Sequence, residues 1–182
     1  MEATQQQLMF VGASLLCAAV GSVHDVLERR IPNFVTFTGI VAGLSLHTIV
    51  GGWHGLGDSM LAGLIAGCFC MLFYLAGGMG AGDVKLMTAV GCVGGLASLG
   101  TTMIATAAAG AIFAIGLSII HGRTGSTLRN VGVLVEHHWR KGLKPHPELN
   151  VDNDATLRMP FALPVAAGCL FTLCDLALGG LS

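Results

Sequence analysis

Two aspartates stand at the edges of apolar segments in this sequence. Asp25 lies in "GSVHDVLERRIPN" and Asp83 lies in "GAGDVK". A carboxylate beside a membrane span is costly and is commonly functional. When two carboxylates converge in a partly dry site they cannot both ionise easily, so the pair shares one proton near neutral pH. One carboxylate can then take a proton from water while the other, protonated, donates to a peptide carbonyl, which is the chemistry of an aspartic protease.

The residue types alone also permit a purely structural role for each aspartate. Each carboxylate could cap a helix N-terminus or pair with a neighbouring cation. The neighbouring cations are Arg29, Arg30 and Lys85. His24 precedes Asp25 directly and could tune it, although a histidine at a helix end is commonly only interfacial. Spacing and residue type therefore leave the catalytic and the structural interpretations open.

The composition indicates a polytopic membrane protein. The chain has 182 residues, of which 53% are hydrophobic and 10% are charged, whereas a soluble domain carries about 25% charged residues. The mean hydropathy is +0.75, and the apolar residues form long runs. The net charge is −1, so no excess of basic residues indicates a surface for nucleic acid. The predicted surrounding is the lipid bilayer. The first apolar run follows "MEATQQQ", which lacks the basic residues of a signal peptide, and we expect a retained span.

Six segments are long and apolar enough to be candidate spans. They are residues 7–24, 34–51, 57–76, 84–99, 101–120 and 159–179. Helices are the open-ended structures that satisfy the backbone in lipid. The sequence therefore predicts an all-α bundle of about six transmembrane helices forming a single membrane-embedded domain. The same reasoning makes the boundary between the fourth and fifth spans the least well marked.

The basic residues predict the orientation of the bundle. All nine Lys and Arg residues fall in or beside the connections after the first, third and fifth spans. The positive-inside rule places these connections in the cytoplasm and both termini on the opposite side. Asp25 ends the first span and Asp83 begins the fourth, so both carboxylates are expected at the cytoplasmic membrane face and at similar depth.

Several other features have predicted structural roles. Gly80 and Gly82 are expected to allow close backbone approach and unusual dihedral angles beside Asp83, and Pro32 and Pro160 are expected to set the start of a span. Residues 122–157 form a predicted cytoplasmic loop, whose first part can be an interfacial amphipathic helix. The apolar face of that helix would contain Val131, Leu134, Val135 and Trp139. The six cysteines lie in apolar segments without a CxxC pair, so we expect core residues and no metal or cofactor.

Three motifs in order resemble the type IV prepilin peptidases. "GAGDVK" matches the Gly-x-Gly-Asp signature of membrane aspartyl proteases, and "DVLERRIPN" resembles the first-loop motif of the prepilin peptidases. "RMPFALPVAAG", residues 158–168, resembles the start of their last span. The resemblance implies that Asp25 and Asp83 are the two catalytic aspartates. Supporting or substrate-positioning roles are expected for Lys85, Pro32, Asn33 and Pro160, although Lys85 could equally extend to anionic lipid headgroups.

The resemblance also implies a substrate and a place of action. The expected substrate is a prepilin-like or pseudopilin protein with a short basic leader and an apolar helix, cleaved at the cytoplasmic face of the inner membrane. Longer family members carry a cysteine-rich insertion near the first spans and methylate the new N-terminus. That insertion is missing here, so we expect cleavage without methylation. The short form resembles peptidases of Flp or tight-adherence pili and also preflagellin peptidases, with the "RMPFALPVAAG" ending favouring the pilus type.

Two other functions fit the same residues. One is an intramembrane aspartyl protease that cuts within the span of its substrate, and mapping the cut distinguishes it from a leader peptidase. The other is a small transporter in which Asp25 and Asp83 relay protons or cations, with flux but no proteolysis. No feature of the sequence predicts an oligomeric state.

Overall fold

Helices and no strands are found among the residues that the computed structural model describes. These are residues 2–122, Gly125, residues 129–130 and 132–133, His137, Gly142 and residues 160–179. The helices with defined bounds are α1 (Glu2–Glu28), α2 (Asn33–Leu75), α3 (Ala81–Gly94), α4 (Leu96–Ile120) and α6 (Ala162–Gly179). Four of them, all except α3, are long and apolar enough to cross a membrane. The all-helical membrane architecture is thus confirmed, while the count of six spans and the side of the termini stay predictions.

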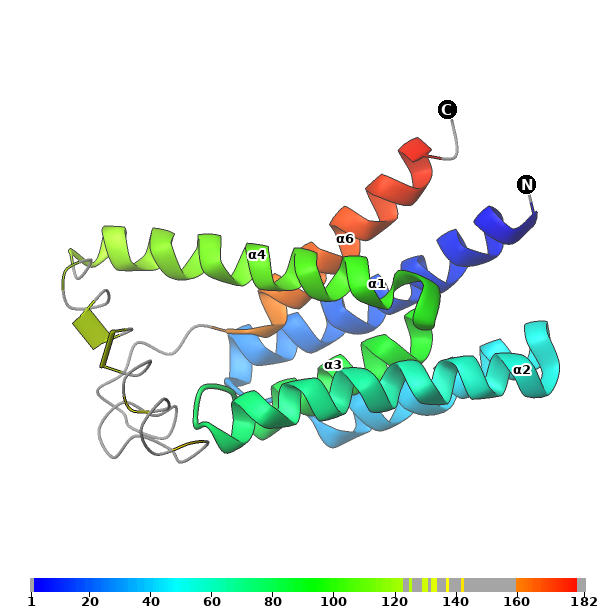
Figure 1. Ribbon diagram of the computed structural model, residues 1–182, viewed down its shortest axis with the longest axis horizontal. Coiled ribbons are helices and arrows are strands. Elements are labelled where there is room, and N and C mark those ends of the chain that lie inside the picture. The colour runs from blue at the N-terminus through cyan, green and yellow to red at the C-terminus, as the bar shows by residue number, and fades with distance from the viewer. Residues whose placement is uncertain are drawn as a thin grey trace.

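Helix α2 contains the second and third predicted spans, joined through one glycine. Gly52 has φ 57° and ψ −141°, which breaks the helical geometry within an otherwise continuous helix. His47 Nδ1 and Asp58 Oδ2 lie 3.7 Å apart across this break, whereas eleven residues of straight helix would separate them by about 16 Å. The chain therefore turns back at Gly52, and the two halves of α2 lie side by side (Figure 1).

The boundary between α3 and α4 differs from the predicted spans 84–99 and 101–120. Helix α3 already begins at Ala81 and ends at Gly94, and α4 begins at Leu96. The separating residue, Gly95, has φ 74°, a left-handed conformation that residues with a Cβ rarely adopt. Residues 96–99 consequently belong to α4, because the single glycine at 95 is enough to end one helix and start the next.

The short helix α3 is the most enclosed element of the described chain. It packs on α2 and α1, and α6 packs on both α1 and α4. A Cβ added at Gly43 would lie 2.6 Å from the Cys92 carbonyl carbon, and Gly63 faces the Cys92 thiol from the other half of α2. These glycines let the two halves of α2 approach α3, since close approach of helices in a membrane depends on small residues.

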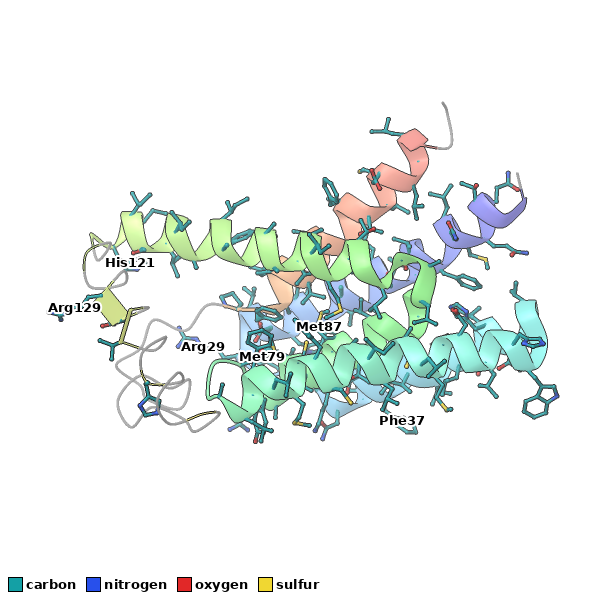
Figure 2. All side chains as sticks on the ribbon, viewed as in Figure 1. Arg29, Phe37, Met79, Met87, His121 and Arg129 are labelled. Atoms are coloured by element: carbon teal, nitrogen blue, oxygen red, sulfur yellow. The ribbon has the colours of Figure 1, made fainter. Side chains whose placement is uncertain are left out.

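The two ends of the bundle carry different connections (Figure 1). The N-terminus and C-terminus lie at one end, together with the turn at Gly52. The other end holds residues 29–32 and 76–80, the end of α4 and the start of α6, and Figure 2 labels Arg29 and Met79 there. Most of the predicted loop 122–157 lies outside the described residues. All four positions of its predicted apolar helix face lie outside them too.

Candidate active site

Segments far apart in the sequence meet around Asp25. The carboxylate stands in the last turn of α1, one turn before the helix ends at Glu28. Its Oδ2 accepts a hydrogen bond of 3.3 Å from the backbone N–H of Ala162, the first residue of α6. The first N–H groups of a helix have no partner within their own helix. The start of the last helix is therefore held against the first predicted catalytic aspartate.

Asp83 is placed by the start of α3. Gly80 precedes the helix, and its backbone N–H donates a hydrogen bond of 3.2 Å to Asp83 Oδ2. A Cβ on Gly80 would also lie 3.2 Å from that oxygen, so the glycine leaves room for the carboxylate. The predicted unusual dihedral angles are wrong for Gly80, whose φ of −79° and ψ of 152° are ordinary extended values. The left-handed glycine of this connection is Gly77, with φ 76°, because the reversal occurs directly after α2.

The connection between α1 and α2 packs on the glycine-rich segment. A Cβ on Gly82 would be in contact with the Ile31 side chain at 3.4 Å. Further along the two segments, Lys85 Nζ donates a hydrogen bond of 2.9 Å to Asn33 Oδ1. The "IPN" segment and the "GAGDVK" segment are thus joined by one apolar contact and one polar contact. These contacts fix the start of α2 relative to the helix that carries Asp83.

The electrostatics of Asp83 differ from those of an exposed aspartate. The residue precedes the predicted fourth span. Its pKa is raised from 3.8 to about 6, first by burial and second by the negative charge of Asp25, while the hydrogen bond from Gly80 acts in the opposite direction. Burial disfavours the charged carboxylate, and a neighbouring negative charge does the same. Asp83 therefore keeps its proton to a higher pH than an exposed aspartate does, and the charge of Asp25 contributes to this shift.

The structural alternative is present in part. Both carboxylates accept a backbone N–H at the start of a helix, as a capping residue does. Within the described residues, however, no ion pair joins Asp25 or Asp83 to an arginine or lysine. Lys85 instead bonds Asn33. Each carboxylate thus has a single hydrogen bond from the described residues and retains lone pairs that water or a substrate can use.

Three other predicted residues have resolved positions. Pro32 stands immediately before α2, with φ −62° and ψ 138°, and Pro160 accepts a hydrogen bond of 3.4 Å from Leu163 N–H at the start of α6. Both prolines precede their helices, as predicted. His24 turns to Glu28, at 3.6 Å, and edge-on to Phe34, with ring centroids 6.0 Å apart. It has no described bond to Asp25.

An apolar groove lies beside Asp25. Its volume is about 320 Å³, and it runs between the end of α1 and the start of α6. The lining residues are Ser22, Val23, Val26, Leu27 and Leu163. None of these side chains is charged, so the groove suits an aliphatic or aromatic group. Within the described ranges no three potential metal ligands gather, and the absence of a metal or cofactor stays a prediction.

Sequence reasoning missed Ser22 and Ala162. Ser22 Oγ lies 2.7 Å from the carbonyl oxygen of Ala162, the same residue whose N–H bonds Asp25. A signal for Ser22 was available, because a residue three positions before Asp25 lies on the same helix face. Ala162 offered none, since it acts only through its backbone.

The comparisons with known proteins give one match. The family model described as "Type IV leader peptidase family" matches residues 10–115, more than half of the chain. The matched range includes both Asp25 and Asp83 and ends before α6. No curated protein and no solved structure matches the chain.

Proposed function

The chain belongs to the type IV leader peptidase family, and from this premise we propose that it is a membrane aspartyl endopeptidase that removes the basic leader of prepilin-like substrates. A leader-peptidase type of protease follows from the family. The observation that carries the finer proposal is the interaction of Asp83 with Asp25, which raises the pKa of Asp83. Two carboxylates that share a proton are the catalytic group of an aspartic protease.

The two aspartates take different roles in the proposed reaction. Asp83 holds the proton, because burial and the charge of Asp25 favour its neutral form. Asp25 accepts a proton from water as the water oxygen attacks the scissile carbonyl carbon, and Asp83 gives its proton to the carbonyl oxygen. The resulting diol then breaks its C–N bond. The proton on Asp25 passes to the leaving amine, and a diol hydroxyl returns a proton to Asp83.

The surroundings of Asp25 support a substrate that is basic on one side of the cut and apolar on the other. The groove beside Asp25 is lined by uncharged side chains and can take the apolar part. Arg29 and Arg30 lie at the same end of the molecule, so a positively charged leader would remain in water or at the lipid headgroups. The positive-inside rule supports a cytoplasmic location for this end. The inner membrane is the expected site.

The connection after α1 supports cleavage without methylation. Only residues 29–32 separate α1 from α2, so there is no room for the cysteine-rich insertion that the longer relatives carry. The substrates expected from the resemblance are pilins of Flp or tight-adherence systems. The proposal keeps six spans, with the two halves of α2 each crossing the bilayer and α3 completing the bundle.

The test is co-expression of this protein with a prepilin-like protein, followed by gel shift and mass spectrometry of its N-terminus. Wild type is compared with Asp25→Asn and Asp83→Asn at matched membrane levels. We expect one cut at the leader boundary and no cut by either variant. Uncut wild-type samples with pH-driven ion flux in proteoliposomes would instead indicate the transporter. A cut within the apolar helix would indicate an intramembrane protease, and cutting that survives either substitution would exclude the aspartate pair.

A further inference from the structure

Ala162 is bound to α1 at two points. Its N–H donates to Asp25 Oδ2 at 3.3 Å, and its carbonyl oxygen accepts the Ser22 hydroxyl at 2.7 Å. Ser22 and Asp25 are one turn apart on the same face of α1, so both can bind the backbone of Ala162 in α6. Ser22 is 5% exposed and Ala162 is fully buried. Water therefore cannot easily replace either bond.

The hydroxyl of Ser22 has a single proton and two acceptors. Besides Ala162, it lies 2.8 Å from the carbonyl oxygen of Ala18, four residues earlier in α1. The bond to Ala18 fixes the rotamer of Ser22 on its own helix. The bond to Ala162 then fixes the start of α6 relative to α1. A buried polar group with two well-placed partners specifies one arrangement of the two helices.

We propose that Ser22 is a positioning residue of the active site, whose hydroxyl holds the start of α6 so that the Ala162 N–H orients the Asp25 carboxylate. This inference rests on the proposed function. Without the hydroxyl, the bond from Ala162 to Asp25 would be the remaining polar link described between these two helix ends. The carboxylate would then follow the movement of α6. Displacement of a catalytic group by about 1 Å can cost on the order of 100-fold in rate.

The test compares Ser22→Ala, Ser22→Thr and a matched control. Ser14→Ala serves as the control, because Ser14 is a buried serine of the same helix, bonds Val11 O at 2.8 Å and contacts the Cys169 thiol of α6. It stands about three turns before Asp25. We expect Ser22→Ala to lower kcat on the order of 10-fold with KM within about twofold. Ser22→Thr, which keeps the hydroxyl, restores kcat, and Ser14→Ala leaves it unchanged.

A second readout needs no substrate and so separates this inference from the proposed function. Hydrogen–deuterium exchange of the peptide containing residues 160–166 is measured in nanodiscs for the same variants. We expect faster exchange in Ser22→Ala alone, since the start of α6 is released from α1. If wild type cleaves no prepilin, the proposed function fails, but hydrogen exchange still tests whether Ser22 holds the start of α6 against α1. Unchanged exchange in Ser22→Ala, or an equal kcat loss in Ser14→Ala, would overturn the inference.

Discussion

The two ends of the bundle each contain half-buried carboxylates, but the neighbours of these carboxylates differ: a histidine at one end and a second carboxylate at the other. At the end with the turn of α2, Asp58 Oδ2 accepts the Leu96 N–H at 3.1 Å and faces His47 Nδ1 at 3.7 Å. The His47 ring lies 3.1 Å from the Val93 carbonyl through Nε2. It also stacks on Phe10, with ring centroids 3.9 Å apart. Asp58 and His47 thus each bind one backbone group, the Leu96 N–H and the Val93 carbonyl.

At the other end, the described residues give Asp25 and Asp83 one backbone hydrogen bond each and no basic partner. Asp58 caps the start of α4 and not its own helix. The comparison shows that residue type and depth do not separate a structural carboxylate from a reactive one. The separating features are a buried histidine neighbour at one end and a second carboxylate at the other.

The largest expected effect contrasts Asp83→Asn with Asp58→Asn. Loss of the acid–base pair should lower cleavage by about 100-fold or more, whereas Asp58→Asn should leave cleavage per folded molecule nearly unchanged. Asp58→Asn weakens the cap of α4 and should lower the free energy of unfolding by about 1 kcal/mol. Cleavage assays and thermal melts in the same detergent measure both quantities. A variant of Asp58 that melts like wild type but does not cleave would break the comparison.

A second contrast uses one glycine from each end. Gly95→Ala forces a Cβ onto a residue with φ 74°, at 2.6 Å from the His47 ring and 2.7 Å from Asp58 Oδ2. It should destabilise the fold by about 1–3 kcal/mol. Gly80→Ala has ordinary backbone angles and should fold normally, but its Cβ would crowd the Asp83 carboxylate at 3.2 Å. We expect it to lower kcat with little change in melting temperature. Equal melting losses in the two variants would contradict this assignment.

The sequence predicts most of the helices, but not all of the turns that connect them. Apolar runs and the distribution of basic residues locate the helices, because burial in lipid constrains composition over some twenty residues. The turn at Gly52 lies between the predicted spans 34–51 and 57–76, whereas the turn at Gly95 lies inside the predicted span 84–99. Single glycines are common in membrane helices, and only a positive φ distinguishes a turn from a packing contact.

The active site shows the same division. Asp25 and Asp83 were predicted because a carboxylate is rare in such a sequence and therefore informative. The contact between Gly82 and Ile31, and the two bonds to Ala162, were not predicted, because they involve backbone or small apolar groups. Such contacts arise from the packing of α6 on α1, which no local pattern encodes.

A smaller effect concerns pH. The folded protein has the pKa of Asp83 raised to about 6 from 3.8, so between these values it binds more protons than the unfolded chain. The stabilising contribution of neutral Asp83 is complete below the lower value and is lost as pH rises through the upper one. We expect the melting temperature of wild type to fall between about pH 4 and pH 6.5 more steeply than that of Asp83→Asn.

The partner of Asp83 provides the check on that pH effect. Asp25→Asn removes the charge that raises the pKa of Asp83, so the fall in melting temperature should move to lower pH. The matched variant at the other end, Asp58→Asn, should leave the position of the fall unchanged. A fall that stays in place in Asp25→Asn would show that burial alone sets the pKa of Asp83, and the two carboxylates would no longer count as a pair.

The smallest expected effect concerns the exposed tether between Lys85 and Asn33. An exposed hydrogen bond to a charged group contributes little to stability, about 1 kcal/mol or less, so Lys85→Met should melt close to wild type. The same bond links the start of α2 to the helix that carries Asp83, and its loss should lower kcat about threefold through a looser carboxylate. Asn33→Asp offers Lys85 an acceptor of the same shape and should retain activity, whereas Asn33→Leu should resemble Lys85→Met. If Lys85→Met reduced cleavage and Asn33→Leu did not, the lysine would act on the substrate directly. The bond between Lys85 and Asn33 would then have no role in positioning Asp83.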